Sequence, residues 1–89
     1  AKDSVMKPDQ VRLFIKPYCG WCHEAIAWLK DRGVAFEELD VTSSQAAYRE
    51  MVELTGQSSA PCMDADGEIL ADFGVDELEV FWKRFDDEN

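Results

Sequence analysis

Apolar and polar positions alternate along the chain with two different periods. Five largely apolar, β-prone residues, Val11–Ile15, predict a central strand that is buried on both faces. Pro17 prevents this strand from continuing, and Gly20 permits a tight turn. Residues 21–32 then have apolar side chains at helical spacing, and Gly33 suits the end of a helix. The apolar positions of this predicted helix are Cys22, Ala25, Ile26 and Leu29.

A second strand and a second helix follow in the same way. Residues 34–41 place apolar side chains at alternate positions, which predicts a strand. Residues 42–56 begin with hydroxyl side chains suited to a helix N-cap and end at Gly56, which predicts a helix. The apolar positions are Val34, Phe36 and Leu39 in the strand and Ala47, Met51 and Leu54 on one face of the helix.

The sequence after Gly56 predicts a β-hairpin and a C-terminal helix. Two short strands, Cys62–Ala65 and Glu68–Ala71, flank Asp66-Gly67, a strong signal for a type I′ turn. Residues 75–85 follow with apolar positions of an amphipathic helix, Leu78, Phe81, Trp82 and Phe85.

The predicted order is β-α-β-α-β-β-α, an α/β fold with a mixed four-stranded sheet flanked by three helices. The first two strands should be parallel, with a right-handed crossover. Residues 10–86 form the single domain, after a lead-in over residues 1–9 and before a solvated tail over residues 87–89.

The composition of the chain limits the kinds of partner that it is expected to bind. The chain has 89 residues, 46% of them hydrophobic, and a net charge of −10, which argues against non-specific binding to nucleic acid or anionic membranes. No apolar run approaches the length of a membrane span, and no signal-peptide core is visible. Three cysteines, two of them close together, do not resemble a secreted disulfide framework, so we expect a reducing, cytoplasmic setting.

The motif Cys19-Gly20-Trp21-Cys22-His23 carries the candidate chemistry, and two kinds of chemistry fit it. As a dithiol, Cys19 at the start of a helix would face free backbone N–H groups and the positive end of the helix dipole. Lys16 would add a cation nearby, so Cys19 should be stabilised as the nucleophilic thiolate. Cys22, one turn into the helix and facing inward, would be the resolving thiol. The alternative without redox chemistry is a pair of reduced structural cysteines.

The same motif is also the attachment signature of a c-type haem, with His23 as axial ligand. That interpretation is disfavoured because the motif follows a buried strand inside a β-α-β pattern. A zinc site is weaker still, because only His23 and Cys62 remain as further ligands of these types. On the predicted helix, His23 should face solvent, where its charge could modulate the Cys19 thiolate.

From Val11 to about Phe85 the chain resembles the glutaredoxins, which have the thioredoxin fold. The resemblance rests on "KPYCGWC" after the first strand, on "LTGQSSAP", which is similar to the family's "TGxxTVP", on the hairpin and on "DEL" in the last helix. It implies a thiol–disulfide oxidoreductase that uses glutathione and reduces protein disulfides or protein–glutathione mixed disulfides. It also implies a cis peptide bond before Pro61, with Ala60 offering its backbone to an extended thiol peptide.

The resemblance further implies a set of glutathione-binding residues. Lys16 would pair with the glycyl carboxylate. The polar residue on the second helix that assists Lys16 in the family falls at Tyr48 here, with Arg49 one step further on. Asp76 or Glu77 would lie near the γ-glutamyl ammonium. Each of the charged residues has solvated surface as its alternative role. The full predicted set is Lys16, Tyr18, Trp21, Arg49, Ala60, Pro61 and Asp76.

Departures from the family pattern keep other functions open. Ser59-Ala60-Pro61 replaces "TVP", and Asp72-Phe73-Gly74 replaces the usual small residues before the last helix, so a flavin-dependent reductase such as thioredoxin reductase could replace glutathione. Gly20 between the cysteines resembles members that bridge a [2Fe–2S] cluster between two protomers, with Cys19 and glutathione as ligands. Without a cluster we expect a monomer. Cys62 should be a buried strand cysteine, with glutathionylation or a second disulfide as the alternative. We expect Asp64 to face solvent near the edge of the sheet, without a function.

Overall fold

The computed structural model describes residues 8–86 of the chain. Most of the predicted lead-in and the whole predicted tail, residues 1–7 and 87–89, lie outside the described residues. The elements are β1 (Val11–Ile15), α1 (Gly20–Asp31), β2 (Glu37–Asp40), α2 (Gln45–Thr55), β3 (Cys62–Ala65), β4 (Glu68–Ala71) and α3 (Val75–Asp86). The predicted order of strands and helices is confirmed.

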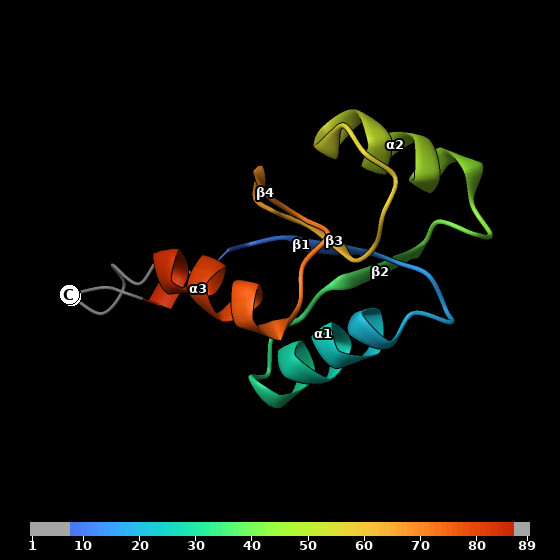
Figure 1. The fold of residues 1–89 in the computed structure, drawn as a ribbon. Coiled ribbons are helices and arrows are strands. Elements are labelled where there is room, and N and C mark those ends of the chain that lie inside the picture. The colour runs from blue at the N-terminus through green and yellow to red at the C-terminus, as the bar shows by residue number, and fades with distance from the viewer. Residues whose placement is uncertain (1–7, 87–89) are drawn as a thin grey trace.

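The strands form one mixed sheet in the order β2-β1-β3-β4. β1 is parallel to β2, while β3 is antiparallel to both β1 and β4. Helix α2 covers one face of this sheet, and α1 and α3 cover the other (Figure 1). The carboxyl end of β1, the start of α1 and the loop before β3 therefore meet at one end of the sheet, where Phe14 pairs with Cys62.

The alternation of side chains along the central strands builds a core on each face. Leu13 on β1 and Met63 on β3 pack with α1 and α3, where Trp28 and Trp82 meet edge to face with ring centroids 5.7 Å apart. Phe14 on β1 and Cys62 on β3 point the other way and pack with Met51 of α2. These side chains are at most 2% exposed except for Trp28. Helix α1, which begins at the Cys19–Cys22 motif, is therefore closely packed against the sheet.

Local sequence signals set the ends of several elements. Ser44 caps α2 by accepting a hydrogen bond of 3.1 Å from the N–H of Ala47, and Gly56 ends that helix in the left-handed region with a φ of 73°. In the hairpin turn, Asp66 and Gly67 have φ values of 53° and 91°. Positive φ at both central residues is the requirement of a type I′ turn, so the hairpin prediction is confirmed.

Two details of the predicted strands and helices are wrong. The second strand begins at Glu37 rather than at residue 34, because β2 lies at the edge of the sheet and pairs only with β1, starting opposite Arg12. Val34 and Phe36 instead pack against the core on the α1 and α3 face from the connecting segment. Leu54 is 38% exposed and does not belong to the buried face of α2.

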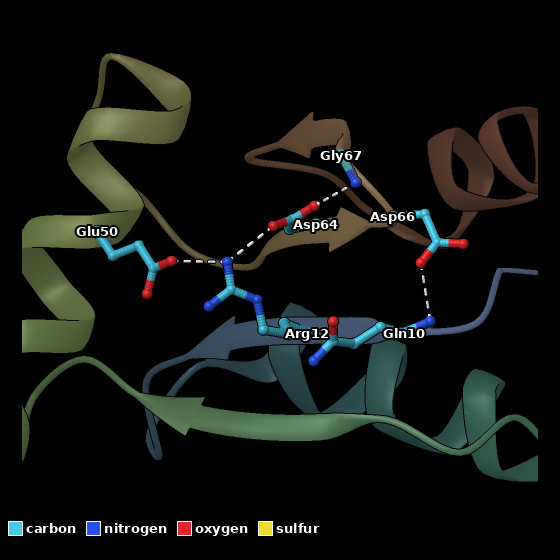
Figure 2. Close-up of polar contacts among 6 residues, drawn as sticks. All are labelled: Gln10, Arg12, Glu50, Asp64, Asp66 and Gly67. Atoms are coloured by element: carbon cyan, nitrogen blue, oxygen red, sulfur yellow. Dashed lines mark hydrogen bonds and ion pairs between the residues drawn. The ribbon is translucent and has the colours of Figure 1, made fainter.

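A charged cluster on the α2 face of the sheet was not predicted. Arg12 of β1 places Nη2 2.7 Å from Glu50 of α2 and 2.8 Å from Asp64 of β3 (Figure 2). Asp64 also accepts a hydrogen bond of 2.8 Å from the N–H of Gly67 in the hairpin turn. The expectation that Asp64 faces solvent near the sheet edge is wrong, because β3 is an interior strand and the Asp64 side chain is only 14% exposed. Arg12 also interrupts the predicted burial of β1 on both faces.

Candidate active site

Cys19 lies at the junction of β1 and α1 and acts as the N-cap of the helix. Its backbone is extended, with φ −97° and ψ 117°, and its Sγ accepts a hydrogen bond of 3.1 Å from the N–H of Cys22. The sulfur thus takes the place that a serine or aspartate oxygen usually fills at a helix start. This N–H and the positive end of the helix dipole therefore face the sulfur of Cys19.

Cys22 is one turn further along α1 and has no exposed surface. Burial, and after it a hydrogen bond with Cys19, raises the pKa of the Cys22 thiol to about 12. Cys22 is therefore a protonated thiol at neutral pH, while Cys19 is half-buried and accessible from the end of the sheet. The two cysteines have the different environments that a nucleophilic and a resolving thiol require.

The loop between α2 and β3 forms the second wall beside Cys19. Its Ala60–Pro61 peptide bond is cis, as predicted, and the carbonyl oxygen of Ala60 lies 3.9 Å from Sγ of Cys19. Two residues earlier in the same loop, the carbonyl oxygen of Ser58 accepts a hydrogen bond of 3.4 Å from Nζ of Lys16. The structure thus brings Lys16, Cys19, Ala60 and Pro61 together.

Gln57 and Cys62 hold this loop in place through hydrogen bonds, and no pattern in the sequence predicts the contacts of Gln57. The Gln57 side chain donates 3.1 Å hydrogen bonds to Sγ of Cys62 and to the carbonyl oxygen of Ser59, and it accepts one of 2.6 Å from the N–H of Ser59. Cys62 is fully buried, and its thiol donates to the carbonyl oxygen of Ser59 at 3.0 Å. The prediction of a buried strand cysteine is confirmed, and burial raises the pKa of its thiol.

A hollow of about 290 Å³ lies between the N-terminal part of α1 and the start of α3. Trp21, which is 55% exposed, lines it together with Asp76, and both belong to the predicted binding set. Glu24 and Glu77 also line it, and Glu24 was not among the predicted residues. Glu24 could not be singled out beforehand, because only the packing of α1 against α3 brings it to this place.

The remaining predicted residues lie further out. Tyr18 is 79% exposed next to Cys19. Arg49 is exposed on α2, and among residues 8–86 no hydrogen bond or ion pair joins it to the residues around Cys19. His23 is exposed, as expected, but Nε2 lies 2.7 Å from the carbonyl oxygen of Pro17. Since a carbonyl oxygen only accepts, His23 donates and links α1 to the turn that precedes the dithiol.

The different environments of the three thiols predict a selective chemical modification. Iodoacetamide at pH 7.5 should alkylate Cys19 alone in the folded, reduced protein, because Cys22 and Cys62 are buried and protonated. Peptide mapping by mass spectrometry would check this, with urea-unfolded protein as the control in which all three react. Modification of Cys62 before Cys19 in the folded protein would contradict the assignment.

The fold places the chain among known structures. It superposes on the thioredoxin-like protein BC3987 with a TM-score of 0.74 and 29% identity, covering 81% of this chain and 99% of the other. The glutaredoxin from Archaeoglobus fulgidus gives a TM-score of 0.72 at 17% identity, covering 81% and 84%. With the sheet order and the dithiol at the start of α1, these similarities define a thioredoxin-like fold.

The sequence comparisons identify the family within this fold. The glutaredoxin family model matches residues 11–70. Glutaredoxin 3 of Escherichia coli K12 is 32% identical over 68 residues, which cover 76% of this chain and 80% of that protein. The chain belongs to the glutaredoxin family, and it is a thiol–disulfide oxidoreductase like its members. None of the helices described is long and apolar enough to cross a membrane.

Proposed function

We propose that this protein is a glutathione-dependent dithiol oxidoreductase with Cys19 as nucleophile and Cys22 as resolving thiol. The observation that carries the proposal is the contrast between the two sulfurs. Sγ of Cys19 accepts the N–H of Cys22 at the helix start, whereas Cys22 is fully buried with its pKa raised to about 12. Glutaredoxins as a family use glutathione, and the family membership of the chain supports the same reductant here.

With a protein disulfide, the Cys19 thiolate attacks one sulfur and forms a mixed disulfide, while the other substrate sulfur leaves as a thiolate. Cys22 then gives its proton to a nearby thiolate and attacks Sγ of Cys19. The Cys19–Cys22 disulfide forms, and the second substrate sulfur leaves. Two glutathione molecules reduce this disulfide and become glutathione disulfide. With a protein–glutathione mixed disulfide, the Cys19 thiolate attacks the glutathione sulfur, and the protein sulfur leaves as a thiolate. A second glutathione then attacks the glutathionyl sulfur on Cys19, which forms glutathione disulfide and frees Cys19 without Cys22.

The contacts around Cys19 support a placement for the substrate. The backbone of Ala60, held by the cis bond to Pro61 and 3.9 Å from Sγ, would pair with the cysteine of an extended peptide. Lys16, 3.4 Å from the Ser58 carbonyl, would bind a carboxylate beyond it. Tyr18 and Trp21 would contact apolar parts of the partner, and Asp76 would meet an ammonium group. Arg49 remains part of the proposed binding set, as a charge further from Cys19. The cytoplasmic location and the alternative function as a [2Fe–2S] carrier remain predictions.

A coupled assay tests the reductant. With a glutathione mixed disulfide as substrate, we expect turnover that depends on glutathione and is followed through NADPH oxidation by glutathione reductase. Replacing glutathione and its reductase with thioredoxin reductase should give little turnover. The reverse pattern would contradict the proposal and assign the protein to the thioredoxin-reductase-dependent branch.

A further inference from the structure

The loop before β3 leaves the main chain of one residue open beside the dithiol. In the described part of the chain, the N–H of Ala60 has no hydrogen-bond partner, and its carbonyl oxygen has only the 3.9 Å contact with Sγ of Cys19. The residues on either side are engaged. Ser59 is bound at both its N–H and its carbonyl oxygen, and the carbonyl oxygen of Pro61 accepts a hydrogen bond of 2.8 Å from the N–H of Asp72. An extended chain that pairs with this loop therefore finds both main-chain groups available at Ala60.

Gln57 makes the two contacts to the main chain of Ser59. Its Oε1 accepts the N–H of Ser59 at 2.6 Å, and its Nε2 donates to the carbonyl oxygen of Ser59 at 3.1 Å. Nε2 also lies 3.1 Å from Oγ1 of Thr55, the last residue of α2, and 3.1 Å from Sγ of Cys62, the first residue of β3. The carboxamide of Gln57 thus fixes the middle of the loop to the two elements that the loop connects.

The planar peptide group carries this constraint on to Ala60. The carbonyl of Ser59 and the N–H of Ala60 belong to one trans peptide unit, so the two groups lie in one plane and point in opposite directions. Two donors hold this carbonyl oxygen, Nε2 of Gln57 at 3.1 Å and the thiol of Cys62 at 3.0 Å. The N–H of Ala60 is therefore turned away from these donors. Gln57 thereby sets the direction of the main-chain group that is open to a substrate.

We propose that Gln57 is a positioning residue through which the enzyme selects disulfides carried by an extended peptide over disulfides without a peptide main chain. It acts through Ala60, whose N–H and carbonyl it holds ready. The main chain beside the reacting cysteine of the substrate pairs with these groups, and its sulfur is brought to Sγ of Cys19. The inference deepens the proposed function and rests on attack by Cys19.

Stoichiometric exchange with two mixed disulfides of thionitrobenzoate tests this. One carries a short peptide with a single cysteine, and the other carries mercaptoethanol, which has no peptide main chain. The Cys19 thiolate attacks the sulfur of the peptide or of mercaptoethanol, and thionitrobenzoate leaves as a coloured thiolate. Cys22 then displaces the bound thiol and forms the Cys19–Cys22 disulfide, so no glutathione is needed. The second-order rate constant of the reduced wild-type protein should be at least about tenfold higher for the peptide, which gains main-chain hydrogen bonds.

Gln57→Ala should slow the peptide reaction about fivefold to tenfold and leave the mercaptoethanol reaction within about twofold, because only the peptide uses Ala60. Gln57→Glu keeps an acceptor for the N–H of Ser59 and loses the donor to its carbonyl oxygen, so the peptide reaction should slow by only about threefold. Gln10→Ala is the matched control, and both of its rates should equal those of the wild type. Gln10 is an exposed glutamine that precedes β1, at the end of that strand remote from Cys19.

Equal rates for the two disulfides in the wild type, or an unchanged ratio of the two rates in Gln57→Ala, would overturn the inference. A merely structural role of Gln57 would slow both reactions alike and leave that ratio unchanged. If Gln57→Ala fails to fold, the same ratio in Gln57→Glu decides the question. The glutathione-coupled assay runs in parallel. No turnover with glutathione, together with a loss in Gln57→Ala that is confined to the peptide, would overturn the proposed reductant and leave the inference on Gln57 standing. If neither disulfide releases thionitrobenzoate, both proposals fail.

Discussion

Cys19→Ser should lower kcat/KM for disulfide reduction by at least about a thousandfold, because a serine hydroxyl is not ionised near neutral pH and, among residues 8–86, no carboxylate or imidazole hydrogen-bonds to this position. The loss should be chemical rather than structural. A serine oxygen is a good N-cap and can accept the N–H that Cys22 now donates to Sγ at 3.1 Å. Circular dichroism and thermal unfolding should therefore match the wild type, while the glutathione-coupled assay shows the loss.

Cys22→Ser is the matched variant that separates attack from resolution. It should retain turnover of glutathione mixed disulfides, in which only Cys19 reacts, and lose most of its turnover of protein disulfides. The buried hydroxyl should also cost about 1–3 kcal/mol of unfolding free energy, because Cys22 has no exposed surface. Turnover that survives Cys19→Ser and disappears in Cys22→Ser would reverse the assigned roles.

The parts of the fold that the sequence predicts correctly are those set by local chemistry. The hairpin around Asp66 and Gly67 needs two residues that tolerate positive φ, and the sequence supplies them next to two short apolar runs. The start of β2 is different, because it depends on where β1 offers a pairing partner. The alternation at Val34 and Phe36 predicts burial, and both residues are half-buried, yet only the register opposite Arg12 decides that the strand begins at Glu37.

The active-site residues likewise include some that the local sequence predicts and others that only the folded structure reveals. Cys19 and Cys22 are three residues apart, so helical geometry alone predicts that one caps α1 and the other faces inward. Glu24, by contrast, reaches the hollow only because α1 packs against α3. Gln57 is equally hidden, because its side chain finds its partners only after the loop before Pro61 has folded. Such contacts follow from tertiary packing, which cannot be predicted from the spacing of apolar residues along the sequence.

The Arg12 cluster shows how a charge can be accommodated inside this small sheet. The Arg12 side chain is 20% exposed, and a single nitrogen serves Glu50 and Asp64, with side chains 40% and 14% exposed. The hydrogen bond with Glu50, and next the one with Asp64, raise the pKa of Arg12 above its already high ordinary value. The guanidinium stays charged throughout the working pH range and joins α2 to the two central strands (Figure 2).

Arg12→Leu should lower the free energy of unfolding by about 3 kcal/mol, because it leaves the largely buried Asp64 carboxylate without its cation. Asp64→Asn should cost less, about 1–2 kcal/mol, since an amide oxygen can still accept the N–H of Gly67. In the double variant the two losses should not add, and a coupling of about 1–2 kcal/mol is expected for groups in one network. Urea denaturation of the four proteins measures this cycle.

Arg49→Leu on the exposed surface of α2 is the control and should stay within about 0.5 kcal/mol of the wild type. If Arg12→Leu were no more destabilising than Arg49→Leu, Arg12 would not be what holds α2 to the central strands.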